Sequence, residues 1–218
     1  MTWAHPFIRQ SCVLCAFAAA AGLPPARAAD DVADEAGTSR QELLHALQEV
    51  QKTYGSDAAM MQGQLLGQAI RSGSILEAGI SIPGVEERSG KHFLAFKVDT
   101  GIIYNDRELS AAERPVRAWT DIIEVSLRKF RQLSLPADGV AIMLTYNHRP
   151  YADLTDMRTR LHEGHGALES LTVYLLLADV GEMSAERITA QELVDRSTVL
   201  VDGAPIRVRL VAATPGPK

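Results

Sequence analysis

The stretch from residue 140 to residue 146 constrains the fold of this chain more than any other. It reads Val-Ala-Ile-Met-Leu-Thr-Tyr, a run rich in branched and aromatic side chains and almost free of polar groups. A strand of this composition is typically covered on both faces. We therefore expect a central strand, in a sheet that other layers of structure cover.

Further segments alternate apolar and polar residues with the period of two that a strand shows. They are residues 76 to 82, 94 to 104 and 171 to 177, together with residues 197 to 201 and 206 to 211. The polar residues 86 to 90 connect the first two of these segments, which we expect to form an antiparallel hairpin. The pair Asp202-Gly203 predicts a second hairpin, with Pro205 at a sheet edge or at the start of its strand.

Two segments follow the three-and-four spacing of an amphipathic helix instead. The first covers residues 39 to 69, and the turn-favouring residues 55 to 57 interrupt it. This interruption is compatible with one kinked helix or with two helices that abut. The second apolar stripe covers residues 116 to 130 and ends before Pro136.

Two capping-box spacings mark helix starts, because a hydroxyl residue is followed three positions later by a glutamate. They pair Ser110 with Glu113 and Thr189 with Glu192. Helices and strands are interspersed without a regular βα repeat, so the sequence predicts an α+β fold. We expect a mainly antiparallel or mixed sheet of about five to six strands, with the long N-terminal helix and the second amphipathic helix packed on it.

The first 28 residues have the three parts of a secretory signal peptide. Arg9 precedes an apolar run over residues 12 to 23, and Ala26 and Ala28 provide the small residues of a cleavage site. The apolar run is too short to span a bilayer. We expect residues 1 to 28 to be removed, residues 29 to 38 to form a flexible acidic leader, and residues 39 to 218 to form one domain in the periplasm or outside the cell.

Cysteine usage and charge narrow the range of partners. Cys12 and Cys15 both lie in the apolar run, so the mature domain is expected to hold no disulfide. The chain has a net charge of −5, which becomes −7 when the signal peptide takes Arg9 and Arg27 with it. This acidic balance disfavours nucleic acid. We expect no cofactor and no membrane span in the mature form, and a protein or small-molecule partner of unknown identity. The oligomeric state stays open.

The connection over residues 147 to 167, between the two strongest strands, holds three of the five histidines expected in the mature domain. Imidazole suits zinc and similar ions, so His148, His162 and His165 are candidate metal ligands. The helical zinc-protease motif needs two histidines four positions apart, whereas His162 and His165 are three apart. A short helix that His162 closes explains the same residues without a metal.

The same connection offers a candidate acid–base site. His148 and Tyr151 follow the central strand, and Asp153 lies two residues further along. Loops at the ends of buried strands often carry function, and neutral histidine is a usable base near pH 7. A rigid turn at Arg149 and Pro150, with the Tyr151 ring packed on the sheet edge, explains the same residues as structure.

No motif in the sequence identifies an activity. There is no nucleophile elbow, no phosphate-binding loop and no dinucleotide-binding glycine pattern, and no segment carries a resemblance to a known family. The leading hypothesis is an exported, non-catalytic domain that binds a partner or ligand. The alternative is a metal- or histidine-dependent hydrolase built on residues 147 to 167. The sequence leaves open whether the protein is an enzyme.

Overall fold

The computed structural model describes residues 41–72, 81–149 and 166–210. The chain divides into two compact units, Met1–His45 and Ala46–Lys218. Only residues 41–45 of the first unit are described, and they are helical. The expected signal peptide, the expected acidic leader and the expected helix start at Ser39 lie outside the described residues.

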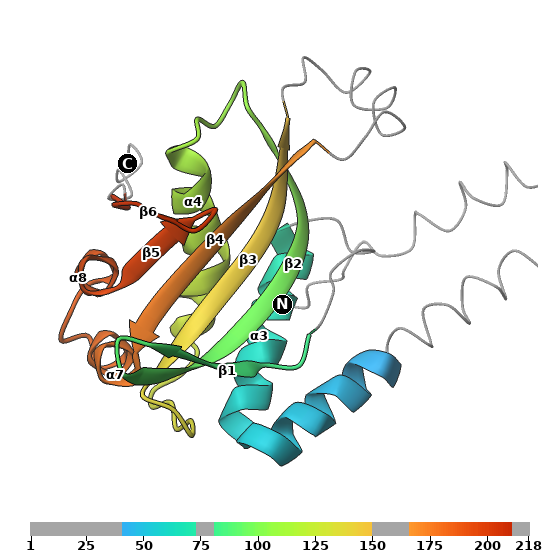
Figure 1. Ribbon diagram of the computed structural model, residues 1–218, viewed down its shortest axis with the longest axis vertical. Coiled ribbons are helices and arrows are strands. Elements are labelled where there is room, and N and C mark those ends of the chain that lie inside the picture. Colours follow the sequence, from blue (N-terminus) through green and yellow to red (C-terminus); the bar gives the residue numbers. More distant parts are fainter. Residues whose placement is uncertain (1–40, 73–80, 150–165, 211–218) are drawn as a thin grey trace, which may run out of the picture. The chain divides into compact units, whose positions relative to one another are not determined.

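The described part of the second unit is built on a six-stranded sheet, in which the strands lie side by side in chain order (Figure 1). The strands are β1 (Gly84–Arg88), β2 (Lys91–Asn105), β3 (Gly139–Arg149), β4 (Ala167–Leu176), β5 (Thr198–Val201) and β6 (Ala204–Pro205). β2 and β3 are parallel, and every other neighbouring pair is antiparallel. The predicted α+β class and the mainly antiparallel sheet are therefore confirmed.

β3 lies between β2 and β4 and confirms the central strand expected over residues 140 to 146. Its side chains that face the main core are fully buried, and burial of an apolar side chain of this size contributes about 1.5–3 kcal/mol. These side chains are Val140, Ile142, Leu144 and Tyr146. The strand expected over residues 171 to 177 is confirmed as β4.

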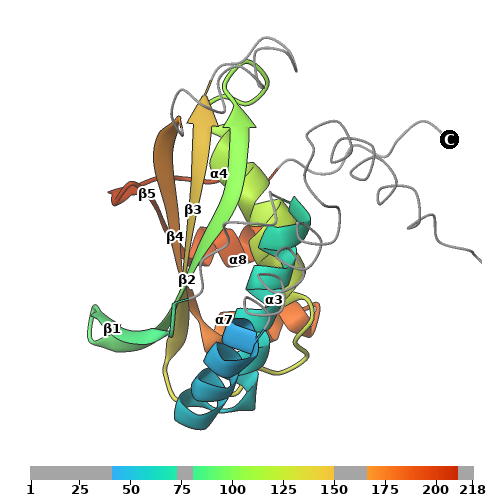
Figure 2. The same ribbon diagram turned by 90° about the vertical axis from the view of Figure 1, so that its right-hand side faces the viewer.

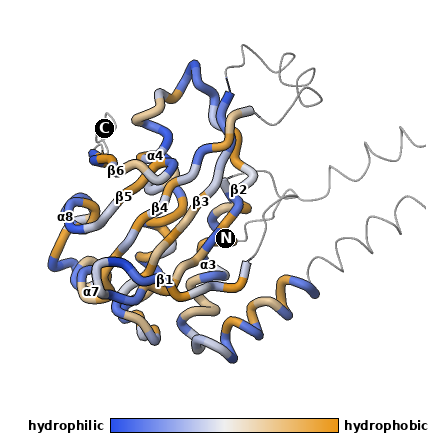
Figure 3. The backbone as a smooth tube through the Cα atoms, in the orientation of Figure 1, coloured by the Kyte–Doolittle hydropathy of each residue, from blue (hydrophilic) through white to orange (hydrophobic). Residues whose placement is uncertain are grey.

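The helices of the second unit lie on one face of the sheet (Figure 2). Helical residues 46–54 end at Gly55, whose φ of +94° and amide hydrogen bond to Gln51 form a left-handed helix cap. α3 (Ser56–Ser72) begins directly afterwards. Hydrophobic and hydrophilic residues alternate along these helical segments in Figure 3, as expected for helices with one buried face.

Three consecutive helical segments cross from β2 to the parallel strand β3. They are α4 (Glu113–Ala118), the π-helix η1 (Trp119–Glu124) and α5 (Val125–Leu127). The predicted stripe is confirmed, because Trp119, Ile123 and Leu127 are buried in the main core. A π turn is wider than an α turn, and Ile122 is fully buried as well. The last helices, α7 (Leu177–Ser184) and α8 (Ala190–Arg196), contribute to the same core.

The first hairpin differs from the prediction. β1 covers Gly84–Arg88 and so includes residues 86–88 of the connection that we expected, and the turn is Ser89-Gly90 with φ of +51° and +71°. Residues 81–83 are not in a strand, and residues 76 to 80 lie outside the described residues. β1 is a short edge strand that bends away from the helices (Figure 2). Because little of it is buried, its sequence is polar and resembles a loop.

β1 covers a small second cluster on the face opposite the helices. Phe93, Ala95 and Ala141 are buried there. The Tyr174 ring meets the Phe93 ring edge-on at 5.3 Å, and its hydroxyl donates to Glu86 of β1 at 3.0 Å. These contacts hold the bent hairpin against the sheet.

The last hairpin is partly as predicted. Asp202 and Gly203 form the turn, both with positive φ, and Pro205 lies in the edge strand β6. The strand expected over residues 206 to 211 is wrong for residues 206–210, which have no regular structure, and residue 211 lies outside the described residues. Gln191 of α8 accounts for this difference: its amide donates to Val208 O at 3.1 Å and accepts from the Leu210 amide at 2.7 Å. The Ile206 amide still donates to Val199 O of β5 at 3.0 Å, and beyond it the chain follows α8.

Candidate functional site

Five polar side chains meet at the end of the sheet where β2 and β3 stop and β4 begins. We call them the rim cluster: Asp106, Arg114, Tyr146, His148 and Glu169. Asp106 directly follows β2, Arg114 lies in α4, and the other three belong to β3 and β4. The carboxyl ends of parallel strands are where open sheets of mixed α and β structure commonly bind ligands. The rim cluster is therefore the candidate site.

Arg114 joins the two carboxylates of the rim cluster. Its Nη1 donates to Asp106 Oδ1 at 2.8 Å, and its Nη2 donates to Glu169 Oε2 at 2.6 Å. Burial works against the charged form of Arg114, but the hydrogen bond and charge of Glu169, followed by the charge of Asp106, prevail and raise the pKa of Arg114. One buried cation thus compensates two carboxylates.

Tyr146 is the deepest member of the cluster. It is fully buried, and its hydroxyl donates to Glu169 Oε1 at 2.6 Å. Burial, and then the bond to Glu169, raise the pKa of Tyr146 far above its ordinary value. The Tyr104 ring packs edge-on against Tyr146 with centroids 5.1 Å apart, and burial likewise raises the pKa of Tyr104. Both phenols therefore stay protonated, and Tyr146 serves as a donor to Glu169.

Asp106 fixes the orientation of His148. The Nδ1 atom lies 2.9 Å from Asp106 Oδ2 and 3.0 Å from Oδ1. A carboxylate only accepts hydrogen bonds, so Nδ1 carries a hydrogen, and in the neutral form of the ring Nε2 is then an acceptor. Nε2 lies 3.9 Å from Glu169 Oε2, beyond hydrogen-bond distance. The side chain of His148 is 21% exposed.

The four carboxylate oxygens of the rim cluster, on Asp106 and Glu169, are all hydrogen-bonded to other members of the cluster. Nε2 of His148 has no such bond to any residue that the structure describes. In the neutral form of the ring, Nε2 is therefore the acceptor of the cluster that is left for a ligand, and Asp106 orients it.

Only one of the residues that the sequence singled out is described. His148 belongs to the rim cluster, whereas Tyr151, Asp153, His162 and His165 lie outside the described residues and stay predictions. Within residues 41–72, 81–149 and 166–210, no group of three or more histidine, cysteine or acidic side chains is arranged to hold a metal ion.

Sequence reasoning missed Asp106, Arg114 and Glu169. Asp106 follows a predicted strand, and Glu169 lies two residues before another. A charged residue next to an apolar strand is a weak signal, since most such residues face solvent. The parallel pairing of β2 with β3 brings these side chains together, and that pairing was not predicted.

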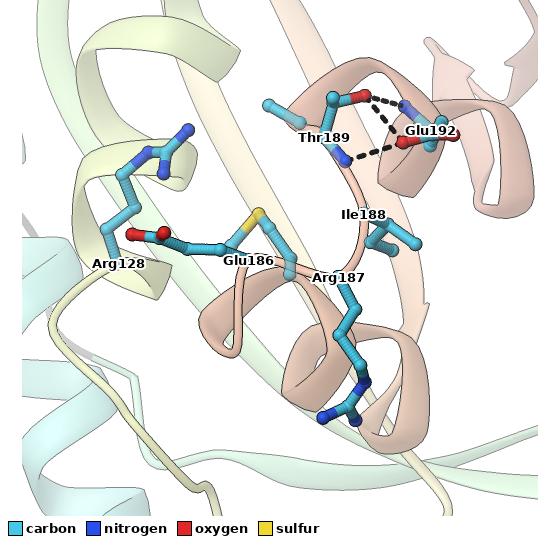
Figure 4. Close-up of a pocket in the computed structure, with 8 residues that line it drawn as sticks. Arg128, Glu186, Arg187, Ile188, Thr189 and Glu192 are labelled. Carbon is cyan, nitrogen blue, oxygen red and sulfur yellow. Dashed lines mark hydrogen bonds between the residues drawn. The ribbon is translucent and has the colours of Figure 1, made fainter.

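A cavity of about 300 Å³ lies elsewhere, where the residues between α7 and α8 meet Arg128 (Figure 4). The predicted capping box of Thr189 and Glu192 forms part of its lining, and it is confirmed by hydrogen bonds in both directions. The Arg128 guanidinium is bonded to Glu124 at 2.7 Å. The polar groups of this cavity thus hold helices in place, and the cavity is a poorer candidate than the rim cluster.

No helix among the described residues is both long and apolar enough to cross a membrane. No protein-family model matches the chain, and comparison with curated proteins and with solved structures finds no similar protein.

Proposed function

We propose that this protein is an exported, non-catalytic binding domain whose protein or small-molecule ligand contacts the rim cluster at His148. The observation that carries the proposal is the placement of the His148 ring. Asp106 lies 2.9 Å from Nδ1, the side chain remains partly exposed, and in the neutral ring Nε2 is then the free acceptor. A preorganised acceptor binds a donor group without losing side-chain entropy at that moment.

The pairing inside the cluster favours binding over catalysis. Acid–base catalysis on a substrate needs further groups that stabilise charge in the transition state. The two Nη atoms of Arg114 are bonded to Asp106 and Glu169, and the Tyr146 hydroxyl is bonded to Glu169. One free acceptor among committed neighbours fits a contact point for a ligand.

Side-chain NMR tests this proposal. Two-bond ¹H–¹⁵N spectra are expected to show hydrogen on Nδ1 of His148. A set of small amines, carboxylates, phosphates, sugars and peptides is then added, and at least one class should shift the His148 Nε2 resonance saturably. His92 is the matched control, because its Nδ1 lies 3.7 Å from Asp138 but its side chain is 61% exposed. Shifts confined to residues far from His148 would refute the proposal.

The Asp106–His148 pair also favours a second candidate, the histidine-dependent hydrolase. In many hydrolytic sites a carboxylate orients the imidazole, whose Nε2 takes a proton from the attacking group. Turnover of a panel of esters, glycosides, peptides and phosphates would be measured. His148→Gln and Asp106→Asn should each lower any turnover about 100-fold or more, while His92→Gln leaves it unchanged. Absence of turnover across the panel removes this candidate.

We also propose that residues 1 to 28 direct export to the periplasm or the medium, and that the amphipathic stripe begins in a helix near Ser39. The early cation, the short apolar run and the small residues at the cleavage site support export. Mass spectrometry of the protein recovered from its source should give Ala29 as the first residue. Intact protein that begins at Met1 would contradict it.

A further inference from the structure

We propose that the chemical group bound at the rim cluster is a primary ammonium, carried by a lysine side chain of a peptide or by a free alkylamine. This inference rests on the proposed binding at His148 and adds the ligand class. It follows from the charge of the cluster, from the two acceptor atoms that face one another there, and from the distance between them.

The charge of the rim cluster favours a cation. Arg114 contributes one positive charge, and Asp106 and Glu169 contribute two negative charges. With a neutral His148 ring the buried cluster carries one net negative charge. A bound ammonium neutralises it, whereas a bound carboxylate or phosphate adds repulsion in a partly desolvated place.

Two acceptors face the position that the ammonium would occupy. In the neutral ring of His148, Nε2 has a lone pair because the hydrogen lies on Nδ1, beside Asp106. Glu169 Oε2 accepts from Arg114 Nη2 at 2.6 Å, and a carboxylate oxygen has a second lone pair. An ammonium has three donor hydrogens and no acceptor, so it matches both atoms.

The separation of these acceptors distinguishes an ammonium from a metal ion. His148 Nε2 and Glu169 Oε2 are 3.9 Å apart. A nitrogen about 2.9 Å from both would subtend about 85° between them, which two hydrogen bonds tolerate. A zinc ion about 2.1 Å from both would need an angle of about 140°, far from tetrahedral. The observed spacing therefore suits a donor nitrogen better than a zinc ion.

Access to the second acceptor selects a slender group. The Glu169 side chain is 7% exposed, against 21% for His148. A guanidinium is a broad planar fork, whereas an ammonium is a compact charge at the end of a flexible methylene chain. The geometry therefore favours a lysine-like amine over an arginine-like one.

Three probes test the ligand class on the full mature chain by the ¹⁵N shift of His148 Nε2. They are n-butylammonium chloride, a blocked tetrapeptide with one lysine, and the same peptide with Nε-acetyllysine. The first two should shift the resonance saturably, and the acetylated peptide should bind at least about tenfold more weakly, since it lacks the charged donor. Binding of the lysine peptide alone identifies a peptide as the source, and binding of butylammonium alone identifies a free amine.

Variants locate the binding. Glu169→Gln should weaken binding of the positive probe about tenfold, and His148→Phe should abolish it, as followed on the backbone amide of Ala167, the register partner of His148. His92→Phe should leave the dissociation constant unchanged. Glu169→Gln also weakens the contact of Glu169 with Arg114. If the Glu169→Gln variant does not fold, the result for His148→Phe decides where the probe binds.

Sodium acetate and zinc chloride complete the test. If either of them shifts His148 saturably and no amine does, or if the acetylated peptide binds as well as the lysine peptide, the ammonium inference is wrong while binding at the rim cluster stands. If no compound of any class shifts His148, both the ligand class and the proposed function fail.

Discussion

Arg114 and Glu169 are 55 residues apart in the chain, and Arg114 Nη2 donates to Glu169 Oε2 at 2.6 Å. Both side chains are 7% exposed. The bond connects α4, at the start of the crossover, to the start of β4. Arg114 also binds Asp106, which connects α4 to the end of β2. A buried ion pair of this kind contributes little net free energy, but removal of one partner leaves a buried charge without compensation.

Arg114→Met should therefore lower the free energy of unfolding by about 3–5 kcal/mol, because two carboxylates lose their common cation. Urea denaturation followed by circular dichroism measures this loss. Arg128→Met is the matched control, since Arg128 is 53% exposed and pairs with Glu124 on the same helical surface. Arg128→Met should lower the free energy of unfolding by no more than about 0.5 kcal/mol. Equal losses in the two variants would contradict the assigned role of Arg114.

The two raised tyrosine pKa values predict a loss of stability in alkali. Burial first, and for Tyr146 also Glu169, raise the pKa of Tyr104 and Tyr146 in the folded state. In the unfolded chain both ionise near pH 10. The stability that the two protonated phenols give the folded state is thus fully present below about pH 10. It is lost as the pH rises further, because only the unfolded state releases the protons. Tyr146→Phe should make this decline shallower in denaturation measured from pH 9 to 11.5, and an unchanged slope would count against the argument.

Gly139 has no room for a side chain. A Cβ there would overlap the carbonyl oxygen of Leu175 and the ring of Phe93. Gly139→Ala should lower the free energy of unfolding by about 1–3 kcal/mol, as overpacking does. Gly84, in β1, would place a Cβ in open space, so Gly84→Ala is the control and should change stability by no more than about 0.5 kcal/mol. Thermal denaturation of the two variants decides between these outcomes.

Two exposed glutamates should titrate below their ordinary range. The hydroxyl and then the amide of Ser110 lower the pKa of Glu113, and the amide and then the hydroxyl of Thr189 lower the pKa of Glu192. The stability that each contributes is present above the ordinary glutamate pKa of about 4.3 and is lost as the pH falls through the lowered value.

Carboxyl ¹³C NMR measures both midpoints. Ser110→Ala should move the Glu113 midpoint upward and leave Glu192 in place, and Thr189→Ala should do the reverse. The two variants thus serve as controls for each other. Midpoints that do not respond to either change would show that these hydroxyls do not contribute.

The spacing of hydrophobic residues was sufficient to predict the elements that have a buried face. β3, β4 and the stripe from Trp119 to Phe130 all contribute to the main core, so their apolar residues recur with the period of a strand or of a helix. β1 and residues 206–210 have few buried side chains. The conformation of these two segments depends on contacts between residues distant in the chain, such as Tyr174 with Glu86 and Gln191 with Val208. The local sequence pattern does not predict such contacts.

The candidate site was predictable only at His148. An imidazole after a central strand is visible in the sequence, and the structure places it in the rim cluster. Asp106 and Glu169 approach it because β2 runs parallel to β3 while β4 runs antiparallel. Strand direction depends on how the crossover packs, which short-range periodicity does not encode.

That parallel pairing has a kinetic consequence. A hairpin closes over a few residues, whereas β2 meets β3 only after the chain between Asp106 and Asp138 has been ordered, at a larger loss of chain entropy. Contacts between distant segments slow folding. Because Arg114 lies in α4, the carboxylates of Asp106 and Glu169 share their cation only once this crossover has packed against the sheet.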